Sequence, residues 1–129
     1  MKIIIIIVII GLFGTVAFNS LSEKDLGTPT IESVQGVELY GYENCVLLDV
    51  RTLNEHRAKS IPNTPIIPIQ ELESRINELS KYKDKKIVVY CRSGNRSKRG
   101  TDILNSHGFD AVNLAGGMNK WKGAVISGE

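Results

Sequence analysis

Three short apolar runs separated by polar, helix-compatible stretches constrain the fold more than any other feature of this sequence. The runs cover residues 45–50, 87–90 and 111–114. They lack the strict apolar–polar alternation of a strand with one face in water. Strands that are apolar along most of their length are typical of a parallel sheet buried between helices. We therefore predict an α/β domain with a mainly parallel sheet and helices on both faces.

The segments between these runs supply the helices. Ile69, Leu72, Ile76 and Leu79 recur at three- and four-residue steps, which predicts a helix over residues 69–79. Residues 97–107 favour a second helix, closed by Gly108 as its C-terminal cap. Residues 54–59 predict a shorter helix, and the prolines within residues 61–68 make that stretch a loop with at most a brief strand.

The first polar and glycine-rich residues after each run predict where a ligand binds. In parallel sheets the binding crevice lies beyond the carboxyl ends of the strands. The three runs end in Asp49 and Arg51, in Cys91, and in Gly116 and Gly117. We therefore expect these residues to gather at one edge of the sheet.

The amino-terminal segment is a candidate export signal. Residues 3–18 carry no charge and follow Lys2. This run is shorter than the ~20 residues that comfortably span a bilayer, and slightly longer than a typical signal core. Residues 1–19 therefore predict a signal peptide or a membrane anchor, residues 20–29 a linker, and residues 30–127 the folded domain. Positive charge before the segment predicts an exported domain, periplasmic or anchored on the outer face of the inner membrane. Cleavage and retention both stay open.

Composition excludes several classes of function. Sixteen Lys and Arg against 14 Asp and Glu give a net charge of +2, which argues against nucleic-acid binding by bulk charge. Two cysteines cannot build a disulfide framework, and two histidines leave little for a metal centre. We therefore expect no metal and no other cofactor.

Cys91 has the surroundings of a reactive thiol. It follows a predicted strand and precedes a predicted helix, across a loop that contains Gly94. Backbone amides in such a loop can converge on an anion at a helix N-terminus, and Arg92 and Arg96 add positive charge. Such settings lower the pKa of a cysteine to ~3.5–7.5. The alternative, a buried structural cysteine, would not need two arginines and a glycine within five residues.

These residues resemble a known family. The loop of residues 91–97 (CRSGNRS) is similar to the active-site loop of rhodanese-domain sulfurtransferases. Residues 48–51 (LDVR) with Glu55, the Ile61-Pro62 pair, and residues 114–117 (LAGG) followed by Trp121 match further motifs of that family. The resemblance covers residues 31–122 and is nearest to the exported single-domain rhodaneses of bacteria. It departs at Lys59-Ser60, where the family commonly has Gly-His, and at Ser93, where some thiosulfate-using members have lysine.

The resemblance implies both an activity and a site. The activity is transfer of a sulfane sulfur from thiosulfate or a similar anionic donor to a thiol or cyanide, through a persulfide on Cys91. The acceptor thiol could belong to a protein. The donor would be bound by the remaining loop residues, namely Arg92, Ser93, Gly94, Asn95, Arg96 and Ser97. Active-site residues are generally held in place by neighbouring side chains and turns. We expect that role here for Asp49, Arg51, Glu55, Gly116 and Gly117.

Two alternative functions stay open. A persulfide carrier or sulfide sensor that turns over poorly alone would use Cys91 in the same way. A phosphatase or arsenate reductase is disfavoured, because those enzymes have one more residue between cysteine and arginine than the four present here. We also expect no disulfide, since Cys45 begins the strand that ends at Asp49, roughly 13 Å away, against a limit of ~7 Å. Trp121 is expected in the core, and His56 as a surface or packing residue.

Overall fold

The sheet in the computed structural model, which describes residues 27–128, is four-stranded and entirely parallel. Its order is β2 (Thr30–Ile31), β6 (Asp110–Leu114), β5 (Lys86–Tyr90) and β3 (Cys45–Asp49). The three predicted runs form β3, β5 and β6, which confirms the predicted α/β fold. The predicted signal or anchor at residues 1–19 lies outside the described residues.

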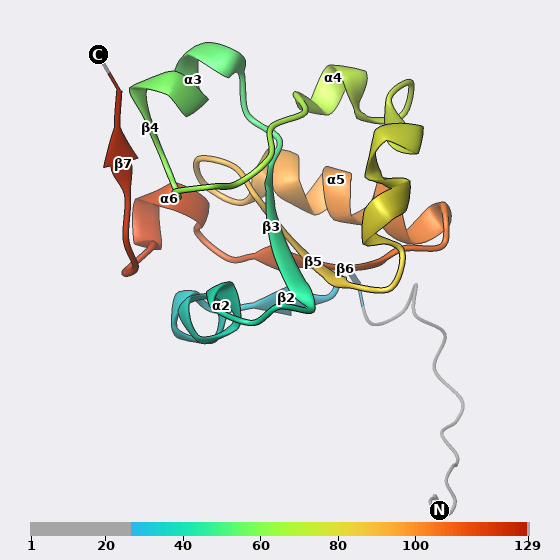
Figure 1. Ribbon diagram of the computed structural model, residues 1–129, viewed down its shortest axis with the longest axis horizontal. Helices are drawn as coiled ribbons and strands as arrows, with labels where there is room; N and C mark the ends of the chain where they lie inside the picture. The colour runs from blue at the N-terminus through green and yellow to red at the C-terminus, as the bar shows by residue number, and fades with distance from the viewer. Residues whose placement is uncertain (1–26, 129) are drawn as a thin grey trace, which may run out of the picture.

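Helices lie between these strands, and a small second sheet lies beside them (Figure 1). The helical elements are α2 (Ser33–Tyr40), α3 (Leu53–Ala58), α4 (Ile69–Leu72), the 3-10 helix η1 (Ile76–Tyr82), α5 (Asn95–Ser106) and α6 (Gly117–Lys120). Two-residue strands β4 (Lys59–Ser60) and β7 (Ile126–Ser127) pair antiparallel. Within residues 27–128, no helix is both long enough and apolar enough to cross a bilayer.

The sheet has a hydrophobic core on each face, as predicted. One core joins alternate strand residues to α4, η1 and α5 and includes Leu48, Val89, Leu72 and Leu104. The other joins the remaining strand residues to α2 and to the segment around α6, where Trp121 is 8 % exposed. Trp121 is therefore a core residue, as expected. Burial on both faces explains why the strands are apolar at successive positions.

The prediction of one continuous helix over residues 69–79 is wrong. The chain forms one α-helical turn, α4, and resumes as the 3-10 helix η1. Between them Arg75 leaves helical geometry, with φ −110° and ψ 17°. The Ser74 hydroxyl donates to the carbonyl of Glu71 at 3.0 Å, a side-chain bond of the kind that competes with regular helix geometry. Leu72 and Leu79 still enter the core, so the apolar spacing identified the buried face but not the break.

Two elements at the start of the domain gave no sequence signal. Strand β2 has only two residues. Helix α2 buries only Gly36 among its eight residues, so it carries no clear apolar stripe. The end of the predicted linker also contacts the domain. The Thr28 hydroxyl donates to the carboxylate of Asp102, and the carbonyl of Pro29 accepts from the amide of Asn113.

The parallel strands place their carboxyl ends together. In Figure 1 the chain rises from α2 through β3 to α3, so the upper end of β3 is its carboxyl end. β3 ends at Asp49 and β5 ends at Tyr90, directly before Cys91, and these two end residues are paired. β6 ends at Leu114, shortly before Gly116. This arrangement confirms that the polar residues of the candidate site meet at one edge.

Candidate active site

The sulfur of Cys91 accepts several hydrogen bonds from its own loop. The amide of Gly94 donates to Sγ at 3.1 Å and the amide of Ser97 at 3.4 Å. The Ser97 hydroxyl oxygen lies 3.3 Å from Sγ. Gly94 has φ 107° and is the N-cap of α5, so the turn that directs these amides inward needs a residue that tolerates positive φ. The first turn of α5 therefore points at the sulfur.

This environment favours the thiolate. Burial by itself raises the pKa of Cys91, whose exposed fraction is 1 %. Hydrogen bonds from the Ser97 hydroxyl and from the amides of Ser97, Gly94 and Ser93 outweigh burial, so the pKa lies below the ordinary value. Cys91 is thus a buried cysteine, but its sulfur faces polar hydrogens on the loop side. The expected nest is present.

The turn after β6 holds the cysteine loop in place. The amide of Met118 donates to the carbonyl of Cys91 at 2.9 Å, and the amide of Asn119 donates to the carbonyl of Arg92 at 3.0 Å. Gly117, with φ 51°, lies so close that a Cβ atom there would collide with the Cys91 carbonyl oxygen. These bonds hold the loop carbonyls against the α6 amides. Gly117 therefore lets α6 pack against the loop, and Gly116 lies beside it, where a Cβ atom on Gly94 would approach the Gly116 amide nitrogen.

Arg96 points to α3. Its guanidinium donates two hydrogen bonds to the Glu55 carboxylate, at 2.8 and 3.0 Å. This bonding lowers the pKa of Glu55 to about 2. The structure therefore gives Arg96 a bracing partner in addition to the donor-binding role expected for it. Glu55 thus lies against the cysteine loop through Arg96.

Asp49 is the buried centre of a second charged group. Its carboxylate is fully buried and accepts from the Arg51 guanidinium at 2.8 and 3.0 Å. His56 Nδ1 lies 2.8 Å from the same carboxylate. Arg51 also donates to the carbonyl of Lys59 at 2.7 Å. Asp49 and Arg51 therefore brace the edge of the site. We expected His56 to be a surface or packing residue and did not predict its contact with Asp49. No sequence motif links these two positions.

A hollow of about 290 Å³ opens beside the cysteine loop, lined by Arg51, Glu55, Ala58, Lys59, Arg92, Met118 and Asn119. Three of these side chains are cationic and one is anionic. Arg92 is exposed, and no acidic partner within residues 27–128 forms an ion pair with it. This hollow can therefore attract a small anion to the mouth of the loop.

The other predicted loop residues divide by exposure. Ser93 and Asn95 have exposed side chains, whereas Gly94 and Ser97 are buried against the sulfur. Asn113 of β6 is a site residue that the sequence analysis did not identify. It accepts a hydrogen bond from the Ser97 hydroxyl at 2.6 Å. Asn113 is the one polar residue in the apolar run 111–114, and this could have marked it as a candidate.

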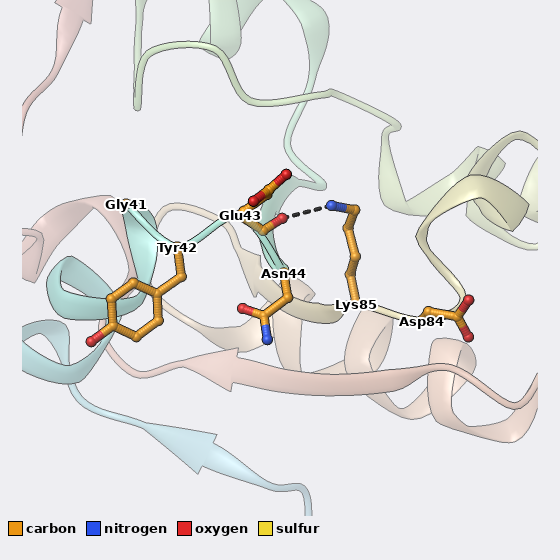
Figure 2. A pocket seen from close by; sticks show the side chains of 6 residues that line it. All are labelled: Gly41, Tyr42, Glu43, Asn44, Asp84 and Lys85. Carbon is orange, nitrogen blue, oxygen red and sulfur yellow. Dashed lines mark hydrogen bonds between the residues drawn. The ribbon is translucent and has the colours of Figure 1, made fainter.

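A second hollow lies at the opposite end of the sheet. It is lined by residues that precede β3 and β5, and Figure 2 shows the Lys85 ammonium donating to the Glu43 carbonyl across it. Cys45, at the start of β3, is a free, half-buried thiol, as is expected of a cysteine far from Cys91. No group of three His, Cys, Asp or Glu side chains in residues 27–128 could hold a metal ion.

Comparison with known families decides which family this site belongs to. Residues 37–124 match the model of the rhodanese-like domain. The chain belongs to the rhodanese family. The human thiosulfate:glutathione sulfurtransferase is 31 % identical over 108 residues, which cover 74 % of this chain and 94 % of that protein.

Other relatives agree. The Arabidopsis thaliana protein named adenylyltransferase and sulfurtransferase MOCS3 is 37 % identical over 98 residues, but these cover 64 % of this chain and only 21 % of that protein. The crystal structure of a rhodanese-related protein from Thermoplasma volcanium superposes with a TM-score of 0.69 at 32 % identity, covering 76 % of this chain and 97 % of that one. Together these matches support rhodanese-type sulfur transfer as the general role of this rhodanese domain.

Proposed function

We propose that this rhodanese transfers a sulfane sulfur from thiosulfate or a similar anionic donor to a thiol or cyanide, through a persulfide on Cys91. The observation that carries this proposal is the set of hydrogen-bond donors around Cys91 Sγ, from the amides of Gly94 and Ser97. Such donors stabilise a sulfur anion without a general base.

In the first half-reaction the Cys91 thiolate attacks the outer sulfur of the donor. A new S–S bond forms, the donor's own S–S bond breaks, and sulfite leaves with the electron pair. The outer sulfur of the persulfide then carries the negative charge. Positive charge at Arg92, Arg51 and Lys59 beside the loop favours approach of an anionic donor.

In the second half-reaction the acceptor attacks the outer sulfur. A thiolate becomes a persulfide, or cyanide becomes thiocyanate, and Cys91 leaves as a thiolate. The loop amides then stabilise the same sulfur as at the start. The cycle is covalent and ping-pong, and it needs no outside oxidant or reductant.

Replacing Cys91 by serine tests the proposal. The Cys91→Ser variant should release no sulfite from thiosulfate, whereas Cys45→Ser should retain activity because Cys45 lies at the other end of β3. Intact mass after incubation with thiosulfate should increase by one sulfur atom in Cys45→Ser and not in Cys91→Ser. Full turnover by Cys91→Ser would overturn the proposal.

The carrier alternative predicts a different kinetic result. The sulfur of Cys91 is almost fully buried, which restricts the acceptors that can reach it. A carrier would take up sulfur in a single turnover and release it rapidly only to a dedicated protein thiol. Fast multiple turnover with cyanide or a small thiol would exclude a dedicated carrier.

We also propose that residues 1–19 export this domain to the periplasm or anchor it on the outer face of the inner membrane. The uncharged residues 3–18 after Lys2 support this. Intact mass of the protein recovered from its host tests cleavage, and a cytoplasmic, uncleaved and membrane-free protein would contradict export.

A further inference from the structure

A chain of three buried polar groups leads from the sulfur into the sheet. Cys91 Sγ lies 3.3 Å from the Ser97 hydroxyl oxygen. That hydroxyl donates to Oδ1 of Asn113 at 2.6 Å. Ser97 is fully buried and Asn113 is 5 % exposed, so water does not replace either partner. Asn113 does not contact the sulfur and would act on it only through Ser97.

The Ser97 hydroxyl has a single hydrogen, so it cannot donate to Asn113 and to Cys91 at once. With its hydrogen on Asn113 Oδ1, the Ser97 oxygen can accept a hydrogen from Cys91 only if Cys91 is a neutral thiol. A thiolate at Cys91 gains a hydrogen bond from the Ser97 hydroxyl, in addition to those from the loop amides, only when the Ser97 hydrogen is directed at the sulfur. The two protonation states of Cys91 therefore favour opposite directions of the Ser97 hydroxyl.

Rotation of the Asn113 side-chain amide supplies both arrangements. Turning the amide by half a revolution replaces Oδ1 by Nδ2, a donor, opposite the Ser97 oxygen. Ser97 then accepts from Asn113 and donates to the sulfur. The terminal torsion of asparagine is broad. Within residues 27–128 no hydrogen-bond partner fixes Nδ2.

We propose that Asn113 is a positioning residue, whose buried amide sets the direction in which Ser97 donates its hydrogen and thereby stabilises Cys91 in both its neutral and its anionic form. On ionisation the Cys91 proton leaves to solvent, the Ser97 hydroxyl turns to the sulfur, and the Asn113 amide rotates. No covalent bond of Ser97 or Asn113 changes. This inference rests on the proposed function only in needing a thiolate at Cys91.

Charged groups near the loop also influence the sulfur. They are Arg92 on the loop, Arg96 on α5, Asp49 at the end of β3, Arg51 after it, Glu55 on α3 and Lys59 on β4. Every comparison below leaves all of these side chains in place. The comparison therefore isolates the path through Ser97.

A double-mutant cycle tests the proposal. Aspartate at position 113 can only accept when ionised, so it would keep the Ser97 hydrogen away from the sulfur. The cycle compares the full chain with its Asn113→Asp, Ser97→Ala and doubly substituted forms, all carrying Cys45→Ser so that Cys91 is the only thiol. The readout is the pKa of Cys91 from the ultraviolet absorbance of the thiolate.

We expect Asn113→Asp to raise this pKa by about one unit more in the presence of Ser97 than in its absence. One unit is a roughly tenfold smaller thiolate fraction at a pH below the pKa. The shift that persists with alanine at position 97 measures direct repulsion by the new carboxylate. Equal shifts in both backgrounds, or no shift, would overturn the proposal.

A second measurement keeps Asn113 and therefore tests the proposal even if the Asn113→Asp variant does not fold. The side-chain amide signals of Asn113 in a nuclear magnetic resonance titration should change with the same pKa as the Cys91 thiolate. In Ser97→Ala they should no longer do so. Signals that stay constant, or that titrate equally without Ser97, would overturn the proposal. Neither experiment uses a sulfur donor, so failure of the proposed sulfur transfer would be recognised separately.

Discussion

Arg96 and Glu55 lie 41 residues apart in the chain, and their side chains form two parallel hydrogen bonds of 2.8 and 3.0 Å. The same Glu55 carboxylate accepts from the amide of Thr52 at the start of α3. One side chain thus caps α3 and ties it to the first turn of α5. Because that turn carries the amide that contacts Cys91, this contact couples the position of α3 to the geometry of the sulfur site.

The Glu55–Arg96 contact should give the protein an acid-sensitive contribution to stability. The folded pKa of Glu55, about 2, lies below its ordinary value of 4.5. The stabilisation is therefore complete above about pH 4.5 and is lost as the pH falls toward 2. We expect Glu55→Gln to lower the free energy of unfolding near neutral pH, and the difference from the parent chain to shrink in that acidic window. Urea unfolding at several pH values measures it.

The Glu78→Gln variant is a matched control for Glu55. Glu78 pairs with Arg75 on the surface, where ion pairs contribute little. This control should change the unfolding free energy much less than Glu55→Gln. A Glu55→Gln effect that does not depend on pH would show that the charge of Glu55 is not responsible.

Removing the charge of Asp49 should destabilise the fold strongly. Asp49→Asn keeps the shape but leaves the buried Arg51 guanidinium without a counter-charge. Breaking one side of a buried ion pair typically costs about 3–5 kcal/mol. Replacing both members with apolar residues, Asp49→Leu with Arg51→Met, should recover part of this loss. The ion-pair explanation would fail if the double variant lost as much unfolding free energy as Asp49→Leu and Arg51→Met lose together when measured singly. Thermal and urea unfolding give the comparison.

The sequence predicts the fold correctly where buried residues form a regular apolar pattern. It fails where an element has no such pattern. β3, β5 and β6 are apolar because helices cover both faces, so their runs identify a parallel sheet. The break after Leu72 depends on the local geometry of Arg75 and on the Ser74 hydroxyl, which apolar spacing does not register. In α2 only Gly36 is fully buried, and the apolar residues packed on the core are half-buried, so the sequence carries no clear sign of this helix.

The site was predictable where residues are neighbours in the loop or follow a strand end. The amides around Cys91 follow from the strand, glycine and helix order. The partners of distant residues did not follow, because His56 and Asn113 meet Asp49 and Ser97 only through the tertiary fold. A histidine on a short surface helix and one asparagine in a strand each have many ordinary explanations, and only the tertiary contacts show what these two residues do.

A methyl group at position 117 should disable the loop. Gly117 has positive φ, and a Cβ atom there would contact the carbonyls of Cys91 and Arg92. We expect Gly117→Ala to move the loop away from α6 and to raise the pKa of Cys91, since its amide donors would no longer converge on the sulfur. Sulfur transfer should fall by about tenfold or more, because a small misplacement of reacting groups is costly. Gly41→Ala, where open space surrounds the new atom, is the control.

Arg92 should govern the apparent affinity for an anionic donor. Its exposed side chain lines the hollow beside the loop, and no acidic side chain among residues 27–128 neutralises it. We expect Arg92→Ala to raise the KM for thiosulfate about tenfold or more, since a charge-assisted hydrogen bond contributes about 1.5–3 kcal/mol and 1.4 kcal/mol corresponds to about tenfold. The KM for a singly charged thiosulfonate, which transfers its outer sulfur to the cysteine and releases a sulfinate, should rise by a smaller factor. Steady-state kinetics with both donors measure this contrast.

Arg99→Ala is the matched control for Arg92, because Arg99 is an exposed arginine of α5 that does not line the hollow. It should leave the KM for both donors nearly unchanged. Added salt should also weaken thiosulfate binding in the parent chain more than in Arg92→Ala, since salt screens an exposed charge. Equal KM increases for thiosulfate and the singly charged thiosulfonate in Arg92→Ala would mean that this side chain shapes the loop and does not attract the anion.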